Sequence, residues 1–533
     1  MKHSCQQRPN ILIFCVDEQR GDHLGCMGHP HLQTPNLDRL AAEGALFRNC
    51  FSSSPVCMPA RATMLTGLTN RVSGVYTNGI NLDESIPTLP GMLAEAGYRT
   101  HAVGKLHHKI WGGRTIAPDE DITLNPERRI YWDWPGHWEG AHYKEFPDHY
   151  YGYQTLDVCN GHVNYVYGDY VTWLERQHPG AYAGYKYRHD DPKPLTIDSE
   201  LHYNHWIADR TIAFIREQVS GKGCRVSGVG DQRQKGDSDS SQPFYVWCSF
   251  PDPHEPFAAV QKWADVYKDL EIDLPAHTCD LSLDNRCEAL QQLGMGQEPF
   301  DPDWTRECIR QTYGMISHVD EQIGRVLDAL EEMGLADDTV VMFISDHGDQ
   351  LGEHGLFYKG IFPFDGHAEI PFIAKVPGTK TPGNEVADVV SMLDLVPTVL
   401  DLAGVPHPDD LIRKMHCDEQ DAVLAPALPG EALTPVLTDG AAPQRKNALI
   451  ELDWVKGPFR PLQMRALVTN DYKLVYYAPT QETLLFDRHN DPDELRNVAE
   501  DPAYAAIVTD MLKKLMAELA RTEHRAYAKI TGA

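Results

Sequence analysis

Four polar clusters each follow directly on a short run of apolar, β-forming residues. They are Asp17-Glu18, Lys105 with His107, His254, and Asp346-His347. Because the C-terminal ends of strands in a doubly wound sheet lie along one edge, clusters that are distant in the sequence can meet in space. The sequence therefore predicts a single site built from the ends of several strands.

The acidic clusters contain donors for a metal ion. Asp17, Glu18 and Asp346 offer oxygen ligands and His347 adds an imidazole, a set that suits Ca²⁺, Mn²⁺ or Mg²⁺ and is compatible with Zn²⁺. Each cluster taken alone is equally typical of an acidic turn or cap. Taken together, they lead us to expect one divalent metal ion, with calcium as the first choice and manganese or magnesium as alternatives.

Fixed positive charge accompanies these donors. Arg61, Lys105 and Lys359 are cations, and His107 and His254 can donate protons or hydrogen bonds. A sulfuryl or phosphoryl group in transfer carries negative charge on its oxygens, which cations beside a metal stabilise. Either lysine alone would be read as a solvated surface residue, but the full set indicates group transfer.

The stretch from 52 to 67, SSSPVCMPARATMLTG, places Cys57 two residues before Pro59 and four before Arg61. This spacing resembles the modification signature of the type I sulfatases. Other motifs of that family follow in its order: Pro9-Asn10-Ile11-Leu12 before Asp17, Leu65-Thr66-Gly67, Gly104-Lys105-x-His107, Pro253-His254-x-Pro256, Asp346-His347-Gly348 with Lys359, and Leu485-Phe486-Asp487 with Asp491-Pro492. The resemblance covers most of the chain and implies an alkaline phosphatase-like fold.

The resemblance also implies a mechanism. A formylglycine-generating enzyme would convert Cys57 to formylglycine, and its hydrate would be held by the metal and Arg61 and attack sulfur through one hydroxyl. His254 and Lys359 would assist the leaving alcohol, and Lys105 would bind sulfate oxygens. His107 would help to deprotonate the second hydroxyl, so that sulfate leaves and the aldehyde is regenerated.

Some positions depart from the commonest family pattern. Ala60 stands where serine is commoner, Glu18 replaces the second of two aspartates, and His347 stands where many members have asparagine. Glu18 and His347 resemble the branch of choline sulfatases and phosphonate monoester hydrolases, although the Lys105 motif remains sulfatase-like. Asn78 resembles a substrate-binding asparagine of that branch.

Three functions follow as hypotheses. The first is hydrolysis of a small sulfate monoester, either an aryl or a carbohydrate sulfate. The alternative is hydrolysis of a phosphonate monoester or phosphodiester, since the same charges serve either group. A third hypothesis, of another class, is a non-catalytic anion-binding or redox protein in which Cys57 remains a thiol.

The regular elements that must position these residues alternate along the first 405 residues. Buried strands are expected at 10–16, 100–103, 243–250, 339–344 and 368–376, and helices at 34–43, 86–97, 206–218, 303–333 and 393–403. This alternation predicts an α/β fold with a large mixed, mostly parallel sheet flanked by helices. Residues 1–405 are expected to form the catalytic domain, with irregular insertions at 111–200 and 220–242.

Residues 406–533 are expected to form a smaller α+β subdomain. Strands at 447–452, 465–468 and 472–477 precede a turn at 485–494 and a helix at 504–527, which predicts a small antiparallel sheet with a terminal helix. Within the 111–200 insertion, a group of aromatic and histidine residues is interpreted either as a substrate wall or as loop packing. The group comprises Trp132, Trp134, His137, Trp138, His142 and Tyr143.

Composition limits the partners. The net charge of −29 argues against nucleic acid, which requires a basic surface. The apolar run at 11–16 is too short for a secretory signal, and no segment approaches the roughly 20 apolar residues of a membrane span. A cytoplasmic location is expected unless an export signal has been removed, with the small sulfated substrate and the modifying enzyme as partners and a homo-oligomer left open.

The twelve cysteines have no C-x-x-C spacing. In a cytoplasmic protein most of them should be reduced, so neither a disulfide framework nor a structural zinc site is expected.

Overall fold

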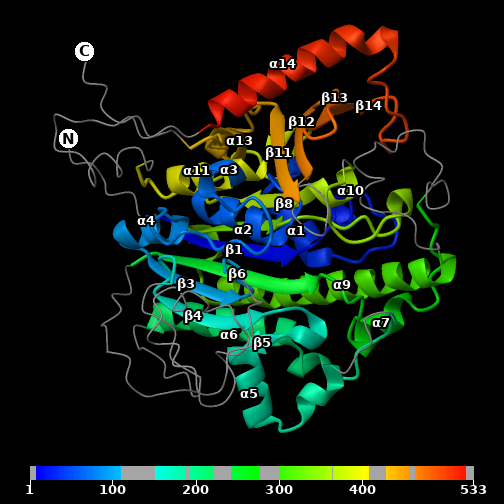
Figure 1. Cartoon of the computed structure of the whole chain (residues 1–533). Coiled ribbons are helices and arrows are strands. Elements are labelled where there is room, and N and C mark those ends of the chain that lie inside the picture. Colours follow the sequence, from blue (N-terminus) through cyan, green and yellow to red (C-terminus); the bar gives the residue numbers. More distant parts are fainter. Residues whose placement is uncertain are drawn as a thin grey trace, which may run out of the picture.

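The central sheet has ten strands, most of them parallel (Figure 1). The structure, a computed structural model, describes residues 8–109, 150–185, 191–220, 242–275, 301–362, 364–406, 428–454 and 462–523. The strand order is β10-β2-β8-β7-β1-β6-β3-β4-β5, with β9 paired to β2. The strands are β1 Asn10–Asp17, β2 Ala45–Phe51, β3 Arg99–Gly104, β4 Thr155–Asn160, β5 Tyr167–Gly168, β6 Phe244–Pro253, β7 Thr339–Ser345, β8 Glu369–Lys375, β9 Asn384–Val386 and β10 Val390–Ser391.

The five strands at the centre, β7, β1, β6, β3 and β4, run parallel to one another. At one end of this run β8 pairs antiparallel with both β7 and β2, and at the other β5 pairs antiparallel with β4. The predicted mixed, mostly parallel sheet is therefore confirmed. Because the central strands share one direction, their C-terminal ends lie along a single edge of the sheet.

Helices cover both faces of the sheet, and the side chains of β1 show how. Ile11, Ile13 and Cys15 pack on the face covered by α2, α4 and α11, and the residues between them pack on the face covered by α1, α6 and α9. The helices of the main domain are α1 Pro35–Glu43, α2 Cys57–Thr66, α3 Asn70–Ser73, α4 Leu89–Glu95, α5 Asp169–Gln177, α6 Tyr203–Ser220, α7 Gln261–Tyr267, α9 Pro302–Glu332, α10 Asp365–Ala368 and α11 Leu395–Leu402.

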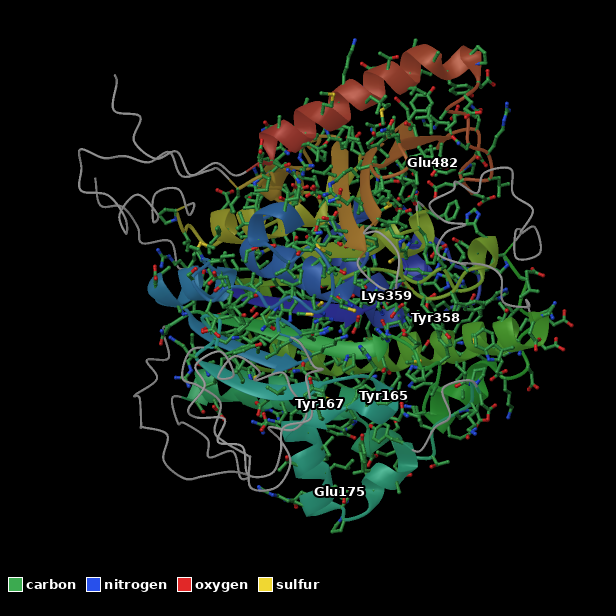
Figure 2. All side chains as sticks on the ribbon, viewed as in Figure 1. Tyr165, Tyr167, Glu175, Tyr358, Lys359 and Glu482 are labelled. Atoms are coloured by element: carbon green, nitrogen blue, oxygen red, sulfur yellow. The ribbon has the colours of Figure 1, made fainter. Side chains whose placement is uncertain are left out.

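A second, antiparallel sheet forms the C-terminal part, as predicted. It contains β11 Asn447–Trp454, β12 Leu462–Thr469, β13 Tyr472–Tyr477 and β14 Glu482–Asp487; α13 Thr434–Asp439 precedes it and α14 Ala505–Arg521 follows it. On β13, Leu474 packs toward α14, whereas Val475 and Tyr477 pack against main-domain residues such as Phe51. Figure 1 shows α14 across the far side of this sheet, and Figure 2 labels Glu482 of β14 in the upper part of the molecule and Glu175 of α5 near the bottom.

Two sequence predictions of local structure were wrong. Residues 485–487 belong to β14 and not to a turn, because the apolar side chains of this segment are buried on both faces of the small sheet. The insertion from 111 to 200 is not irregular throughout, since β4 joins the main sheet beside β3 and α5 follows it.

Several predictions lie outside the described residues. The aromatic group between 132 and 143 is among them, as are nearly all of the 220–242 insertion and most of 406–428. The seven cysteines in the described part of the chain are all free thiols. No helix in that part is long and apolar enough to cross a membrane.

Candidate active site

The predicted strand-end clusters meet at one edge of the main sheet. β1 ends at Asp17, β3 is followed by Lys105, β6 by His254, and β7 by Asp346. Gly104, the last residue of β3, has a φ of +92°, and a side chain there would clash with the carbonyl oxygen of Ser249 on β6. Glycine thus lets the chain turn into the site beside the neighbouring strand.

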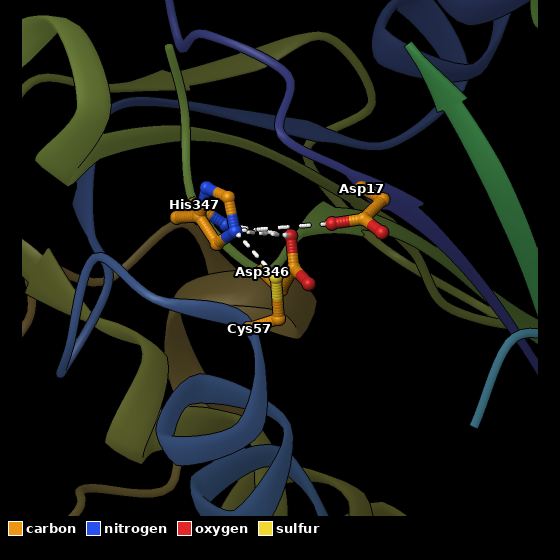
Figure 3. Close-up of side chains that lie close together, drawn as sticks. All are labelled: Asp17, Cys57, Asp346 and His347. Carbon is orange, nitrogen blue, oxygen red and sulfur yellow. Dashed lines mark hydrogen bonds and ion pairs between the residues drawn. The ribbon is translucent and has the colours of Figure 1, made fainter. Parts of the chain in front are cut away.

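Four buried side chains form a group of convergent donors, which we call the donor group: Asp17, Cys57, Asp346 and His347 (Figure 3). One ligand atom from each lies within 4.8 Å of all the others. His347 Nε2 lies 3.2 Å from Cys57 Sγ and 3.8 Å from one oxygen of each aspartate. The structure therefore assembles four of the five predicted metal ligands.

The chemistry of the donor group fits a divalent cation. The Oδ1 atom of Asp17 is buried and has no hydrogen-bond partner, a state that costs free energy unless a ligand compensates it. The ring nitrogen Nδ1 of His347 lies 2.9 Å from the Gly348 carbonyl oxygen, so Nδ1 carries the proton and Nε2 presents a lone pair to the group. An orphaned carboxylate oxygen and an oriented imidazole are features of a metal site.

Arg61 ties helix α2 to this group. Its Nε donates to Asp346 Oδ2 at 2.8 Å, and its Nη1 donates to the Lys105 carbonyl and to Ser249 Oγ, both at 3.1 Å. Burial alone would raise the pKa of Asp346, but the positive charge of Arg61 outweighs burial and holds this pKa below its usual value. Asp346 is therefore ionised and ready to bind a cation.

Cys57 is the first residue of α2, a helix that is buried on all sides. Its thiol is 1% exposed, and burial raises its pKa to about 12. A protonated thiol is a weak nucleophile and a poor redox centre. As an unmodified cysteine without a bound cation, residue 57 is therefore chemically inert.

Lys105 lies on one side of the donor group. Its Nζ pairs with Asp17 Oδ2, so that the two oxygens of Asp17 have different partners. Burial lowers the pKa of Lys105 well below its usual value, and the charge of Asp346 opposes that shift. His107 is buried close by with a φ of +56°. Burial, reinforced by the charges of Lys105 and Arg61, lowers the pKa of His107 well below its usual value, so the imidazole is neutral and can accept a proton.

Glu18 lies on the other side, with His254 and Lys359. Its Oε2 is 2.6 Å from Lys359 Nζ and 2.9 Å from His254 Nε2. The chain turns at Glu18 with a φ of +67°, so its carboxylate has different partners from that of Asp17. The structure thus groups Glu18 with His254 and Glu255 and leaves it out of the donor group, where the sequence placed it.

Lys359 and Tyr358 belong to the loop between β7 and α10 (Figure 2). Burial alone would lower the pKa of Lys359, but Cys57, Glu18 and Glu255 outweigh burial and raise it. Burial lowers the pKa of His254 to about 4. Of these two predicted leaving-group residues, Lys359 therefore carries the proton at neutral pH and His254 is uncharged.

Asn78, predicted to bind substrate, contacts the start of α2. Its Oδ1 accepts a hydrogen bond from the Met58 backbone N–H at 2.9 Å, and its side chain is exposed. Helices begin with unpaired N–H groups, and a side-chain oxygen that satisfies one of them stabilises the helix end. Asn78 therefore holds the turn that presents Cys57.

Sequence reasoning missed two residues of the site, His162 and Glu255. His162 follows β4, and its Nε2 lies 3.3 Å from Asp17 Oδ2. Recognition of 155–160 as a strand would have identified it by the strand-end rule that found the others. Glu255 contacts His254 Nδ1 at 2.6 Å and was visible only as its neighbour in the sequence.

Comparison with known proteins places this geometry in context. A sequence model of the sulfatase family matches residues 9–405, and a model of the C-terminal region of N-sulphoglucosamine sulphohydrolase matches residues 352–521. An arylsulfatase of Clostridium perfringens is 27% identical over 524 residues, which cover 96% of this chain and 94% of the relative.

A choline-sulfatase of Rhizobium meliloti is 30% identical over 501 residues, covering 93% of this chain and 83% of the relative. Among solved structures, a phosphonate monoester hydrolase of Agrobacterium radiobacter superposes with a TM-score of 0.74 at 24% identity, covering 97% of both chains. At that identity the likeness establishes the fold.

Proposed function

Because the chain belongs to the sulfatase family and is a sulfuric ester hydrolase, we propose that it cleaves small sulfate monoesters, aryl or carbohydrate, at the site around residue 57. The observation that carries this proposal is the donor group with Arg61 and Lys105 on its flanks. Buried donors and cations at the start of a helix suit a group whose charge lies on its peripheral oxygens.

We propose that Asp17, Asp346, His347 and residue 57 hold one divalent cation, with calcium as first choice. When bound, such a cation lowers the pKa of a coordinated hydroxyl and stabilises charge on sulfate oxygens. Conversion of Cys57 by a formylglycine-generating enzyme would supply an aldehyde hydrate in place of the inert thiol. The buried, protonated thiol supports this part of the proposal.

The remaining side chains divide the work of the reaction. Arg61 orients Asp346 and neutralises part of its charge. Lys105, whose Nζ pairs with Asp17 beside the donor group, would bind the sulfate oxygens. Lys359, protonated and 2.5 Å from His254 Nε2, is positioned to give a proton to the leaving alcohol, with His254 as its hydrogen-bond partner. The neutral His107 accepts a proton during release of sulfate.

The substrate class is tested by steady-state kinetics of protein co-produced with a formylglycine-generating enzyme. We expect kcat/KM for 4-nitrophenyl sulfate or a monosaccharide sulfate to exceed that for a phenylphosphonate monoester by more than about tenfold, or 1.4 kcal/mol of transition-state discrimination. A preference for the phosphonate ester would establish the alternative activity. Mass spectrometry of the Cys57 peptide reports the modification independently, and an unmodified thiol without turnover would favour a binding protein.

A further inference from the structure

His162 has no part in the mechanism above, yet it contacts both sides of the site. We propose that His162 is a positioning residue, whose single ring fixes the sulfate-binding lysine, Lys105, and the leaving-group histidine, His254. The roles of those two residues rest on the proposed function. The contacts that His162 makes are seen in the structure and do not depend on the proposed function.

The first contact fixes the ammonium of Lys105. His162 Nε2 lies 2.5 Å from Lys105 Nζ, and the same nitrogen is 3.3 Å from Asp17 Oδ2. Since an ammonium group only donates hydrogen bonds, Nε2 accepts one and the imidazole is neutral. Lysine side chains have many rotamers, and ordering them costs conformational entropy. Because His162 and Asp17 hold the Lys105 side chain in one conformation, that entropy is already lost before substrate binds.

The second contact fixes the plane of His254. The two imidazole rings stack with centroids 3.4 Å apart and planes inclined by only 9°. A ring held against a parallel neighbour cannot rotate about its χ2 angle without a clash. The stack therefore keeps His254 Nε2 directed at Glu18 and Lys359, which lie 2.9 Å and 2.5 Å from it.

The position of His162 explains why the site needs it. The side chains of Asp17, Lys105 and Arg61 are fully buried, whereas that of His162 is 12% exposed and that of Lys359 is 13% exposed. His162 thus lies where the buried centre reaches solvent. It covers the Lys105 ammonium, and its loss would admit water to the position that sulfate must occupy.

Two substitutions separate the two contacts. His162→Phe keeps a ring against His254 and removes the acceptor for Lys105, whereas His162→Asn keeps an acceptor and removes the ring. We expect His162→Phe to lower kcat by more than about tenfold with a smaller change in KM, since Lys105 acts on charge that grows in the transition state. We expect a smaller loss for His162→Asn. The matched control is His178→Gln, at an exposed histidine just beyond α5, with unchanged kinetics.

Binding of inorganic sulfate, measured by calorimetry on the metal-loaded protein with an unmodified Cys57, gives a second readout. We expect His162→Phe to weaken this binding at least about fivefold, and His162→Asn to restore part of it. Unfolding midpoints and metal content equal to those of the wild type would exclude a merely structural role.

Wild-type kcat and sulfate affinity in His162→Phe would overturn the proposal. Should that variant fail to fold, wild-type kcat and sulfate affinity in His162→Asn would overturn it equally. If the wild-type enzyme hydrolyses no sulfate ester, the proposed function fails, while the sulfate-binding comparison still decides the role of His162.

Discussion

Two regions in the described part of the chain each contain a lysine that is fully buried among carboxyl groups. They differ in whether the buried charged groups find partners within the protein. The first is the catalytic cluster of Asp17, Arg61, Lys105, Asp346 and His347. The second, the C-terminal cluster, lies where the small sheet meets the main domain and comprises Asp365, Lys473, Arg488 and Glu494. The side chains of Lys105 and Lys473 are both 0% exposed.

The two acidic side chains of the C-terminal cluster share one cation, Lys473. Lys473 Nζ lies 2.5 Å from Asp365 Oδ1 and pairs directly with Glu494 Oε1, while Glu494 Oε2 accepts the Asp365 backbone N–H at 2.7 Å. In the catalytic cluster, Asp17 Oδ1 and Arg61 Nη2 are buried without a hydrogen bond to any described residue. A cation held between two acidic side chains stabilises the fold, whereas several convergent donors around a carboxylate oxygen without a hydrogen bond are typical of a ligand site.

The largest effect is expected at the residue that the catalytic cluster surrounds. Cys57→Ser should lower turnover of a sulfate ester by about 10⁴-fold or more, because serine lacks the second hydroxyl that releases sulfate, while the unfolding midpoint changes little. Cys26→Ser, at a partly buried thiol elsewhere, is the control and should change kcat/KM by less than about threefold. Equal activity of the two variants would contradict the assignment of residue 57.

The next effect is on stability. Lys473→Met should reduce the free energy of unfolding by about 3–5 kcal/mol, since the buried carboxylate of Asp365 would lose its ion pair with Lys473. Urea denaturation measures this loss, and kcat well below the transition should be retained. Lys514→Met removes an exposed ion pair with Asp510 and should cost less than about 1 kcal/mol. Similar losses of unfolding free energy in both variants would contradict the stabilising role assigned to Lys473 in the C-terminal cluster.

A smaller effect tests where Glu18 acts. Glu18→Ala should lower kcat by about 10–100-fold, most for esters with poor leaving alcohols, because Lys359 loses the carboxyl oxygen that lies 2.6 Å from its Nζ. Metal affinity, measured by equilibrium dialysis, should stay close to that of the wild type. A large loss of bound metal with little dependence on the leaving group would instead favour the metal-ligand role predicted from the sequence.

The smallest effect per unit of pH is a pH dependence of stability that arises in the C-terminal cluster. Burial, with the nearby Asp365 charge, raises the pKa of Glu494 from 4.5 to about 8 against the opposing effect of Lys473. The folded chain therefore keeps a proton that the unfolded chain loses above pH 4.5. Stabilisation from this group is complete below that pH and is lost as pH rises toward 8.

The slope should reach at most about 1.4 kcal/mol per pH unit. Urea unfolding between about pH 5 and 8 should show a flatter profile for Glu494→Gln than for the wild type. Identical profiles would show that Glu494 is ionised throughout, which would make the two clusters more alike.

The sequence predicted the convergence of the site because strand direction alone brings strand ends to one edge. The sequence did not predict which side chains of the site form hydrogen bonds and ion pairs with one another. The hydrogen bond from Arg61 to Asp346 joins residues 285 positions apart, and it depends on how β7 and α2 pack in three dimensions. The contacts of Glu18 with His254 and Lys359 were not predicted, because the left-handed conformation of Glu18 is not evident from its neighbours in the sequence.

His162 was missed for a related reason. The strand before it, TLDVCN, has three partly buried residues at its start and lacks the continuous apolar pattern of β1 or β7. β4 lies near the edge of the sheet, where one strand face is less covered and the sequence signal is weaker. The central strands were read correctly because burial on both faces leaves little freedom in residue type.

The packing of helix α2 limits when residue 57 can be modified. Every residue of the helix is buried, and Cys57 is 1% exposed, so a modifying enzyme could not reach the thiol once the helix has packed. The proposed conversion therefore competes with folding and must be completed on a chain that is still open. A molecule that folds before the conversion would have the native fold but no activity. Only unfolding would expose Cys57 to the modifying enzyme again.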